Sequence, residues 1–531
     1  MQFKKVQENT FIFTALFIIF YLLIKNALHA PFTVEDEYLN IAINNPNQLF
    51  GPESGFFDTL WRMQKSFLSL GRLFIVHVFL VVVRAKTFGL NPMAYHWVVF
   101  AFGLVSAFLI YIISRKLNIS KLISFIGAFV FLTGSAYSEI FMRLHTGEAT
   151  GIIFLLIAVY SILKIDEAKG KTFFNLALFS AFLAAFSKES FIFLFPLVFT
   201  IPFLRVETLK WKQVFNKFKV HFILVLILFF TILLSLIIAI KFSGKVFGYG
   251  QPLTLTETLI NNTIWIFKWF ALFSPIVIVA IIDVIRKKKI KEYFPFIIFC
   301  LAWLGSQLII YYKIIISFSQ GRYMMPAGLI FIFALIFSLE YIKRNYILLF
   351  RLMIVLILVL LIRNAKITYI NANEFNARAN AFNLLVDKMI EEKPKKISVY
   401  GGVEFFQSIN THFTLNNYHP EFITTPVVLK NDHNNPYADA SYLGELQADL
   451  NSLYELRTLK ELIADTTVNT MITAEPEEYL PVNYQAIMKT FKHVERVSVG
   501  FSNPGLSDML NPSVWCGNFK NSKRTYLVFK K

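Results

Sequence analysis

Charged residues are scarce in this chain of 531 residues, where Asp, Glu, Lys and Arg together make up 16%. Soluble domains usually carry about a quarter of such residues, so an ordinary water-soluble protein is excluded. Cysteine is scarcer still: Cys300 stands in an apolar run and Cys516 near the C-terminal end. Two cysteines exclude a disulfide scaffold or a cysteine-based metal framework. Hydrophobic residues are abundant instead, at 56% of the chain, and 59 residues are Phe.

The net charge of +18 is unevenly distributed along the chain. Residues 1–370 hold 36 Lys and Arg against 16 Asp and Glu, whereas residues 371–531 are nearly balanced. The positive excess therefore belongs to the hydrophobic part, where membrane topology is its natural explanation. The C-terminal part carries no basic patch, so we expect no nucleic-acid partner.

Apolar runs long enough to cross a bilayer recur up to residue 362 and then stop. They predict eleven spans, near residues 11–28, 95–113, 121–137, 149–164, 172–187, 190–204, 220–240, 264–285, 293–312, 323–341 and 346–362. With the N-terminus inside, the predicted inner loops contain the basic clusters, as the positive-inside rule requires. These clusters are Arg115/Lys116/Lys121, Lys164/Lys169/Lys171, Arg205 to Lys219, Arg286 to Lys291, and Lys343/Arg344. An odd number of spans then places the C-terminal part outside.

Two N-terminal segments allow other interpretations. The first helix could be a cleaved signal peptide, but its apolar stretch is long and the small-residue cleavage site is poor, so we expect an uncleaved anchor. Residues 73–83 are apolar too, and a crossing there would turn every later basic loop outward. The run is short and Arg84 and Lys86 follow it, which favours an interfacial or re-entrant helix on the outer face.

The expected fold class is thus a polytopic α-helical membrane protein with a C-terminal extracytoplasmic α/β domain. We place the membrane domain at residues 1–365, with a first outer loop at 29–94, and the soluble domain at 366–531. After a polar linker with helical spacing at 371–392, strand-like runs at Ile397–Tyr400, Val468–Ile472, Val494–Val499 and Thr525–Phe529 alternate with helical patterns such as 441–464.

The most unusual acidic group directly follows the first helix: Glu35, Asp36 and Glu37 are consecutive. Three adjacent carboxylates repel one another, which raises the proton affinity of at least one and suits a general base or a cation site. A solvated loop is an equally good interpretation of the triplet alone.

Three further groups fall on the predicted outer side. Arg143, His145 and Glu148 lie in one short loop, either as functional groups or as a structural ion-pair cluster. Lys188, in a tight hairpin, and Arg322, followed by Tyr323, both violate the positive-inside rule. Together with Arg72, these cations suit a phosphate group, and the carboxylates suit proton abstraction or metal binding. Such a set fits a substrate whose leaving group is a lipid phosphate.

In this order and sidedness the motifs resemble the GT-C superfamily of polyprenyl-phosphate-sugar-dependent glycosyltransferases, which includes protein O-mannosyltransferases and the aminoarabinose transferase acting on lipid A. The resemblance covers roughly residues 10–365. Its motifs are Asp36-Glu37-Tyr38, Gly71-Arg72 opening a juxtamembrane helix, the turn from Phe88 to Pro92, Glu148, the hairpin around Lys188, and Arg322-Tyr323 with Pro326.

The resemblance implies an inverting transfer of a sugar. Asp36 would take the proton from the acceptor hydroxyl, with Glu35 and Glu37 as alternative bases. Glu37 and Glu148 would orient that base or hold a divalent cation such as Mg²⁺ or Mn²⁺, although many relatives carry Asp where this chain has Glu148. The departing phosphate would be stabilised by cationic and polar side chains: Lys188, Arg322, Arg72, Arg143 and Tyr323.

The implied partners are the bilayer, a polyprenyl-phosphate sugar and an acceptor glycan, lipid or protein. The abundance of Ile, Lys, Asn and Phe resembles an AT-rich bacterial genome, which favours undecaprenyl phosphate as the carrier and the bacterial inner membrane as the location. One rival function is a transporter or flippase of a lipid-linked sugar, which would have ionisable groups near mid-membrane and repeated halves. Another is a ligase or polymerase of surface polysaccharide.

Overall fold

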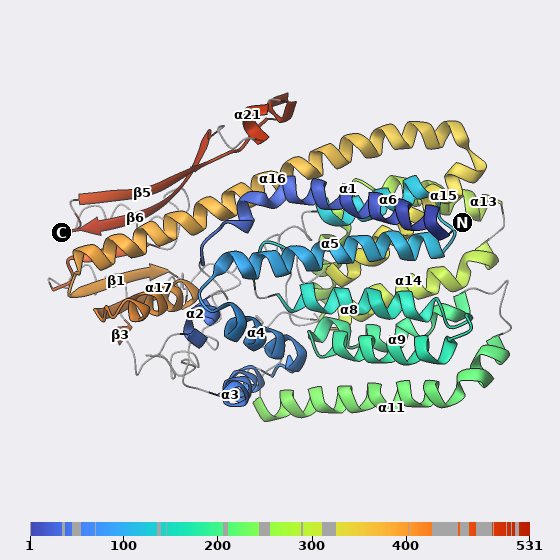
Figure 1. Ribbon diagram of the computed structural model, residues 1–531, viewed down its shortest axis with the longest axis horizontal. Coiled ribbons are helices and arrows are strands. Elements are labelled where there is room, and N and C mark those ends of the chain that lie inside the picture. The colour runs from blue at the N-terminus through green and yellow to red at the C-terminus, as the bar shows by residue number, and fades with distance from the viewer. Residues whose placement is uncertain are drawn as a thin grey trace. The chain divides into compact units, whose positions relative to one another are not determined.

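The computed structural model describes most of the chain, and its helices and strands are shown in Figure 1. The described residues are 2–33, 38–44, 55–69, 71–134, 140–144, 146–204, 211–243, 255–287, 290–310, 325–401, 403–426, 455–456, 467–473, 491, 493–505, 507–510, 512–515 and 520–531. The chain divides into two compact units. The helical unit comprises Met1–Leu23, Met63–Leu80 and Val98–Thr368, and the mixed unit comprises Ile24–Arg62, Val81–Trp97 and Tyr369–Lys531.

Helices dominate the first three quarters of the chain. They are α1 (Gln2–Leu28), α2 (Tyr38–Asn44), α3 (Phe56–Ser69), α4 (Ile75–Phe88), α5 (Pro92–Lys116), α6 (Lys121–Thr133), α8 (Gly147–Ile162), α9 (Gly170–Ala185), η1 (Glu189–Phe191), α10 (Leu194–Val198), η2 (Ile201–Leu204), α11 (Trp211–Ser243), α12 (Leu255–Phe270), α13 (Ser274–Arg286), α14 (Ile290–Ile310), α15 (Met325–Asn345) and α16 (Ile347–Glu392). Within the described residues, six helices are long and apolar enough to cross a membrane: α1, α5, α11, α14, α15 and α16. The predicted class of polytopic helical membrane protein is confirmed.

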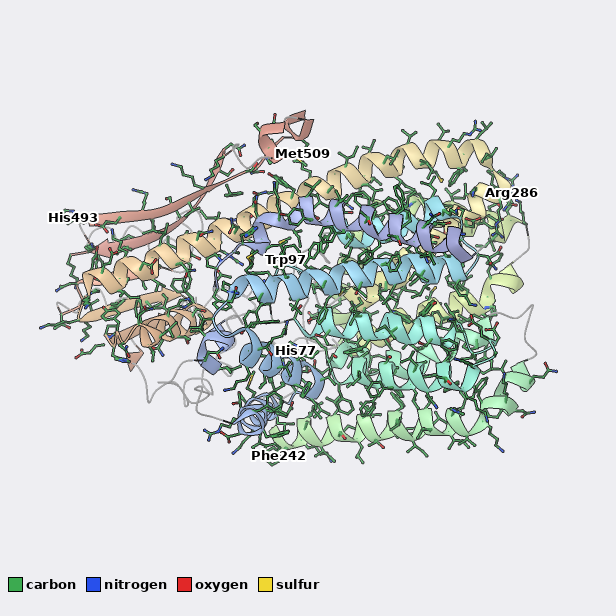
Figure 2. All side chains as sticks on the ribbon, viewed as in Figure 1. His77, Trp97, Phe242, Arg286, His493 and Met509 are labelled. Carbon is green, nitrogen blue, oxygen red and sulfur yellow. The ribbon has the colours of Figure 1, made fainter. Side chains whose placement is uncertain are left out.

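Helix α11 carries large apolar side chains that no other described part of its unit covers. Val220 is 75% exposed, Phe230 62% and Phe242 85%, and Figure 2 shows the side chain of Phe242 near the end of this helix. Apolar surface of this extent is unfavourable in water and marks contact with lipid or another apolar phase. The exposed stretch is therefore the side of the helical unit that the hydrocarbon of a bilayer would cover.

The span predicted at 190–204 is wrong as a continuous helix. The chain there forms η1, α10 and η2 in succession, closed by short-range bonds such as Phe199 N to Pro196 O at 3.1 Å. Pro196 and Pro202 each lack a backbone N–H and cannot donate to the preceding turn. The segment is therefore a series of tight turns, because two prolines interrupt the helical hydrogen bonds.

The expected single span at 264–285 is also interrupted. Helix α12 ends at Phe270 and α13 begins at Ser274, with Pro275 in the first turn of α13. Proline fits the first turn of a helix, where its missing N–H has no intrahelical partner, but not a helix interior. The apolar run is continuous in sequence, so hydropathy alone hides this break.

The lengths of helices α4 and α16 bear on two of the sequence predictions. Helix α4 begins at Ile75, within the apolar run at 73–83, and has 14 residues. That is about 21 Å of helix, which is short of the ~30 Å hydrocarbon layer. Helix α16 joins the span expected at 346–362 and the helical linker at 371–392 into one element of 46 residues. No Pro or Gly occurs within α16, so nothing in its sequence ends the helix at the predicted boundary.

The described strands of the mixed unit form one six-stranded sheet. They are β1 (Lys396–Gly401), β2 (Glu421–Pro426), β3 (Glu455–Leu456), β4 (Thr470–Thr473), β5 (His493–Phe501) and β6 (Ser522–Lys530), accompanied by the short helices α17 (Val403–Leu415), η5 (Ser507–Leu510) and α21 (Pro512–Trp515). The strand order is β3-β2-β1-β4-β6-β5. The first four strands are parallel, and β6 runs antiparallel to both β4 and β5.

Four of these strands, β1, β4, β5 and β6, confirm the predicted runs, whereas β2 and β3 were not predicted. Strand β2 contains Glu421 and Pro426, and β3 has two residues, so neither shows a clear apolar alternation. The helical pattern expected at 441–464 lies outside the described residues except at Glu455–Leu456, which form a strand. At these two residues the expected helix is wrong.

One face of the sheet packs against α16 and α17. Phe382, Leu385 and Met389 recur at helical spacing on α16 and are fully buried with residues of the sheet and of α17. The partners are Ile397, Val399, Phe405, Ile409, Phe413, Ile472, Tyr526 and Val528. The C-terminal half of α16 is thus part of the core of the mixed unit.

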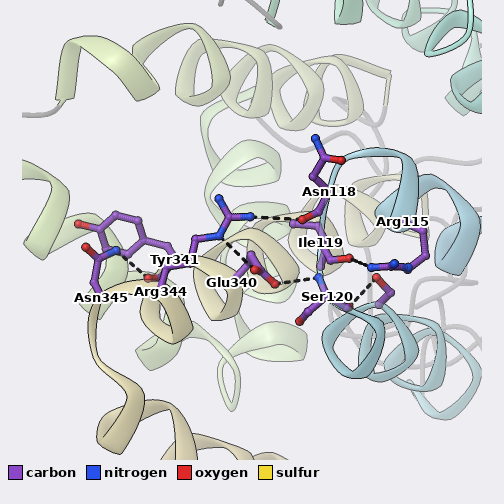
Figure 3. A network of polar contacts seen from close by, with 9 residues as sticks. Arg115, Asn118, Ile119, Ser120, Glu340, Tyr341, Arg344 and Asn345 are labelled. Carbon is purple, nitrogen blue, oxygen red and sulfur yellow. Dashed lines mark hydrogen bonds and ion pairs between the residues drawn. The ribbon is translucent and has the colours of Figure 1, made fainter.

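A polar network joins α15 to the connection between α5 and α6, as Figure 3 shows. The Glu340 carboxylate accepts hydrogen bonds from the Ser120 backbone N–H at 2.9 Å and from Arg344 Nε at 3.1 Å. Arg344 also donates to the Asn118 carbonyl at 3.3 Å. Glu340 is 8% exposed, so its carboxylate satisfies a donor at the start of α6 that water reaches poorly.

We expect Glu340→Ala to lower the free energy of unfolding by about 1–3 kcal/mol, because the Ser120 N–H loses its buried acceptor. The matched control is Arg344→Ala, whose side chain is 63% exposed and whose loss should cost at most about 1 kcal/mol. Unfolding of both variants in the same micelles measures the difference. Equal losses would contradict the capping role of Glu340.

Candidate functional site

Lys188 and Glu148, predicted from different loops, meet in the helical unit. The Lys188 ammonium donates to Oε1 of Glu148, and the two side chains are 9% and 1% exposed. A buried ion pair requires close geometry because both charges have lost their hydration. The structure therefore brings together the cation that violates positive-inside and the acid at the start of α8.

Two glycines of α8 allow this meeting. A Cβ on Gly147 would lie 2.6 Å from the carbonyl oxygen of Ser187, and one on Gly151 would lie 2.3 Å from the Phe191 ring. Both distances are shorter than real Cβ contacts, so any larger residue would push the 187–191 segment away from α8. The spacing i, i+4 puts both glycines on one helix face, and Glu148 lies beside the first of them.

Arg72 lies between α3 and α4 and is 8% exposed. Gly71, with φ +71°, ends the turn after α3, and its N–H donates to Leu68 O at 2.9 Å. A left-handed φ of this kind costs a glycine little. At the start of α4, the Val76 N–H donates to the carbonyl of Phe186, the C-cap of α9, at 3.1 Å. Arg72 therefore precedes a helix that is fixed to the same hairpin that carries Lys188.

Glu189, which follows Lys188 in the chain, also belongs to this cluster. It is 5% exposed and interacts electrostatically with Arg72, Lys188 and Glu148. Burial raises the pKa of its carboxyl above the usual value, and the positive charges of Arg72 and Lys188 oppose that rise. Two cations and two carboxyl groups thus share a poorly hydrated region, where an anion would find strong partners.

Helix α14 contributes a residue that charge and hydropathy did not identify. Gln307, fully buried, donates from Nε2 to the carbonyl of Ser190 at 2.8 Å. Nearby on α14, Trp303 Nε1 donates to the carbonyl of Pro326 at 2.7 Å. The sequence signal that could have identified Gln307 is the polar pair Ser306-Gln307 inside an apolar run, because buried polar side chains require hydrogen-bond partners.

Several predicted site residues lie outside the described residues: Glu35, Asp36, Glu37, His145, Arg322 and Tyr323. Arg143 is described, half-buried between residues 140 and 144. The structure therefore brings Arg72, Glu148 and Lys188 into one unit, and the assignments of the remaining residues stay predictions.

Both flanks of the acidic triplet are anchored within the mixed unit. Before it, the carbonyl of Phe32 accepts a hydrogen bond from Asn383 of α16 at 2.7 Å, and the Phe32 ring meets that of Tyr95 edge-on at 5.7 Å. After it, Asn44 at the end of α2 donates to the carbonyl of Gly89 at 3.3 Å. Gly89 lies in the predicted turn between α4 and α5 and has a φ of +56°.

The donor set does not favour Glu148 as a metal ligand. Its carboxylate is already compensated by the Lys188 ammonium, which would repel a divalent ion at the same oxygen. Within the ranges that the structure describes, no group of three or more His, Cys, Asp or Glu could hold a metal ion. We therefore derive no step through a metal, and a cation at Glu37 stays a prediction.

No protein-family model matches the chain, and no curated protein matches it. Solved structures do. ArnT from Cupriavidus metallidurans in the apo state has a TM-score of 0.51 at 10% identity, over 99% of this chain and 98% of ArnT. ArnT bound to undecaprenyl phosphate has a TM-score of 0.50 at 9% identity, over 98% and 97%. The resemblance predicted from the sequence is thus confirmed at the level of the fold.

Proposed function

We propose that this chain, which has the GT-C fold of the aminoarabinose lipid A transferase ArnT, transfers a sugar from a polyprenyl-phosphate donor to an extracytoplasmic acceptor hydroxyl. The observation that carries the proposal is the buried Lys188–Glu148 pair with Arg72 and Glu189 beside it. Cations held in a poorly hydrated place match the phosphate of a lipid carrier. The undecaprenyl phosphate bound by ArnT supports the same class of ligand for this fold.

In the proposed reaction the cluster stabilises the leaving group. The bond between the anomeric carbon and the phosphate oxygen breaks, and its electron pair passes to the phosphate. Lys188 and Arg72 offer N–H donors and positive charge to the developing negative charge, with Arg322, Arg143 and Tyr323 as further predicted contacts. Glu148 holds the Lys188 ammonium in place before the donor arrives, so little reorganisation is needed.

The acceptor is activated by the acidic triplet. The acceptor oxygen attacks the anomeric carbon from the face opposite the phosphate, which inverts the configuration, and its proton passes to a carboxylate of Asp36. Glu35 and Glu37 are the alternative bases, because repulsion among three consecutive carboxylates raises the proton affinity of at least one of them.

The proposed location is the bacterial inner membrane, with the N-terminus in the cytoplasm and the C-terminal domain in the periplasm. Alkaline phosphatase fused after Lys531 is expected to be active in cells, whereas a fusion truncated after Lys169 is expected to be inactive. The reason is that Lys164, Lys169 and Lys171 define an inner loop. The reverse pattern of activity would contradict the orientation.

Transfer and transport are separated in proteoliposomes that contain the purified full chain. Undecaprenyl-phosphate mannose or glucose is placed in the membrane with an extract of envelope acceptors, and free undecaprenyl phosphate is measured by chromatography. A transferase releases it in step with acceptor glycosylation. Movement of intact donor between leaflets without release would favour a flippase and contradict the proposal.

A further inference from the structure

Three buried polar atoms without a hydrogen-bond partner in the described part of the chain occur at one turn of the helical unit. They are Oε1 of Glu189, Oγ of Ser190 and Oε1 of Gln307. Ser190 and Gln307 are fully buried and Glu189 is 5% exposed. The Gln307 amide is fixed to this turn, because its Nε2 donates to the carbonyl of Ser190 at 2.8 Å.

Such a concentration of unsatisfied groups is unusual. Buried polar atoms are nearly always paired, and an unpaired one is costly because it has lost its bonds to water. Here a carboxyl, a hydroxyl and an amide oxygen come from two consecutive residues and from the side chain that binds their backbone. These atoms would be satisfied together by one polar ligand that enters the turn.

The donors and acceptors of the three groups indicate the chemistry of that ligand. A phosphate only accepts hydrogen bonds. It would therefore pair poorly with the Gln307 amide oxygen, which is also only an acceptor, and with the carboxyl of Glu189. A sugar hydroxyl both donates and accepts, so it can satisfy the amide oxygen, the serine hydroxyl and the carboxyl in either protonation state. Lys188, the preceding residue, already supplies the cation that suits a phosphate.

We propose that Glu189, Ser190 and Gln307 form a subsite that binds hydroxyl groups of the transferred sugar, next to the phosphate contact at Lys188. The inference rests on the proposed function, since it assumes a sugar-phosphate donor. Adjacent residues then bind the two parts of the donor head group. Lys188 binds the phosphate, and Glu189 and Ser190, together with Gln307, bind the sugar. The three residues determine which sugar is accepted.

The test compares Ser190→Ala and Gln307→Met with the wild type, as full chains in nanodiscs. The probes are undecaprenyl phosphate alone and a panel of undecaprenyl-phosphate hexoses, pentoses and their monodeoxy analogues. We expect each variant to lower kcat/KM for the preferred sugar by about tenfold, the value of one hydrogen bond, with affinity for undecaprenyl phosphate unchanged. The deoxy donor that lacks the contacted hydroxyl should be transferred equally by wild type and variant.

Ser161→Ala is the matched control. Ser161 is another fully buried serine whose Oγ has no partner in the described part of the chain, 13 residues beyond Glu148 on α8, or about 20 Å along the helix. This variant should retain wild-type kcat/KM. Wild-type kinetics in both Ser190→Ala and Gln307→Met, or a parallel loss of undecaprenyl phosphate affinity, would overturn the subsite and leave the proposed function intact. A wild type that turns over no donor would instead overturn the proposed function, and the subsite with it.

Discussion

Lys188→Met is expected to lower both the stability of the protein and its turnover. The free energy of unfolding should fall by about 3–5 kcal/mol, because the variant leaves the buried Glu148 carboxylate without its cation. Glu148 is 1% exposed, so water cannot replace the lost ammonium. Turnover of a polyprenyl-phosphate sugar should fall by about 100-fold or more, since a charge at the leaving phosphate is removed. Unfolding in micelles and initial rates measure the two effects separately.

A double variant separates the structural role of Lys188 from its chemical one. Glu148→Gln combined with Lys188→Met removes both charges, so most of the stability should return, as replacement of a whole buried pair is often neutral. Turnover and undecaprenyl phosphate affinity should stay low. Recovery of affinity in the double variant would show that Lys188 does not contact phosphate.

The surface pair Lys121–Glu8 is the matched control for the loss of an ion pair. These groups are 2.5 Å apart with side chains 62% and 26% exposed, so Lys121→Met should cost at most about 1 kcal/mol. Its turnover should equal that of the wild type. A loss as large as that of Lys188→Met would contradict the importance assigned to burial.

Asp36→Asn is expected to lower the rate of transfer by about 10³-fold, because general-base catalysis contributes about 10²–10⁴ and the amide cannot take the proton of the acceptor. The affinity for undecaprenyl phosphate should be unchanged, since in the proposed reaction the base acts on the acceptor hydroxyl and the carrier phosphate is held by Lys188 and Arg72. Initial rates at saturating donor, together with a binding assay, separate the two quantities.

Glu35→Gln and Glu37→Gln are the matched comparisons within the triplet. Each removes one charge and keeps the size of the side chain, as Asp36→Asn does. Because the proposed reaction passes the acceptor proton to Asp36, each of these two variants should reduce the rate less than Asp36→Asn does. Full activity of Asp36→Asn together with loss of activity in Glu35→Gln would move the base to Glu35. A flat response across all three variants would contradict a base in this loop.

Periodicity and charge predicted much of the fold because each depends on local rules. Hydropathy identified α5 and α15, and short strand-like runs identified β1 and β6. The same methods missed the breaks at Pro196 and before Ser274, where an apolar run continues although the backbone does not. A run of hydrophobic residues indicates burial in lipid or protein, not the path of the chain.

The candidate site was predictable where a residue violated a topology rule. Lys188 was identified because a cation on the outer side has no topological reason, and its partner Glu148 because acids are rare in the membrane part. Gln307 was missed because an uncharged amide violates no such rule. Its importance depends on the contact with Ser190, 117 positions away in the chain, which no local pattern contains.

The fate of the two halves of the donor tests the central claim most directly. Undecaprenyl-phosphate sugar labelled with one isotope in the lipid and another in the sugar is incubated with the purified full chain and envelope acceptors. The account predicts that the sugar label moves to the acceptor with inverted anomeric configuration, while an equal amount of lipid label is recovered as undecaprenyl phosphate. Both labels remaining together on the donor, or a product with retained configuration, would contradict it.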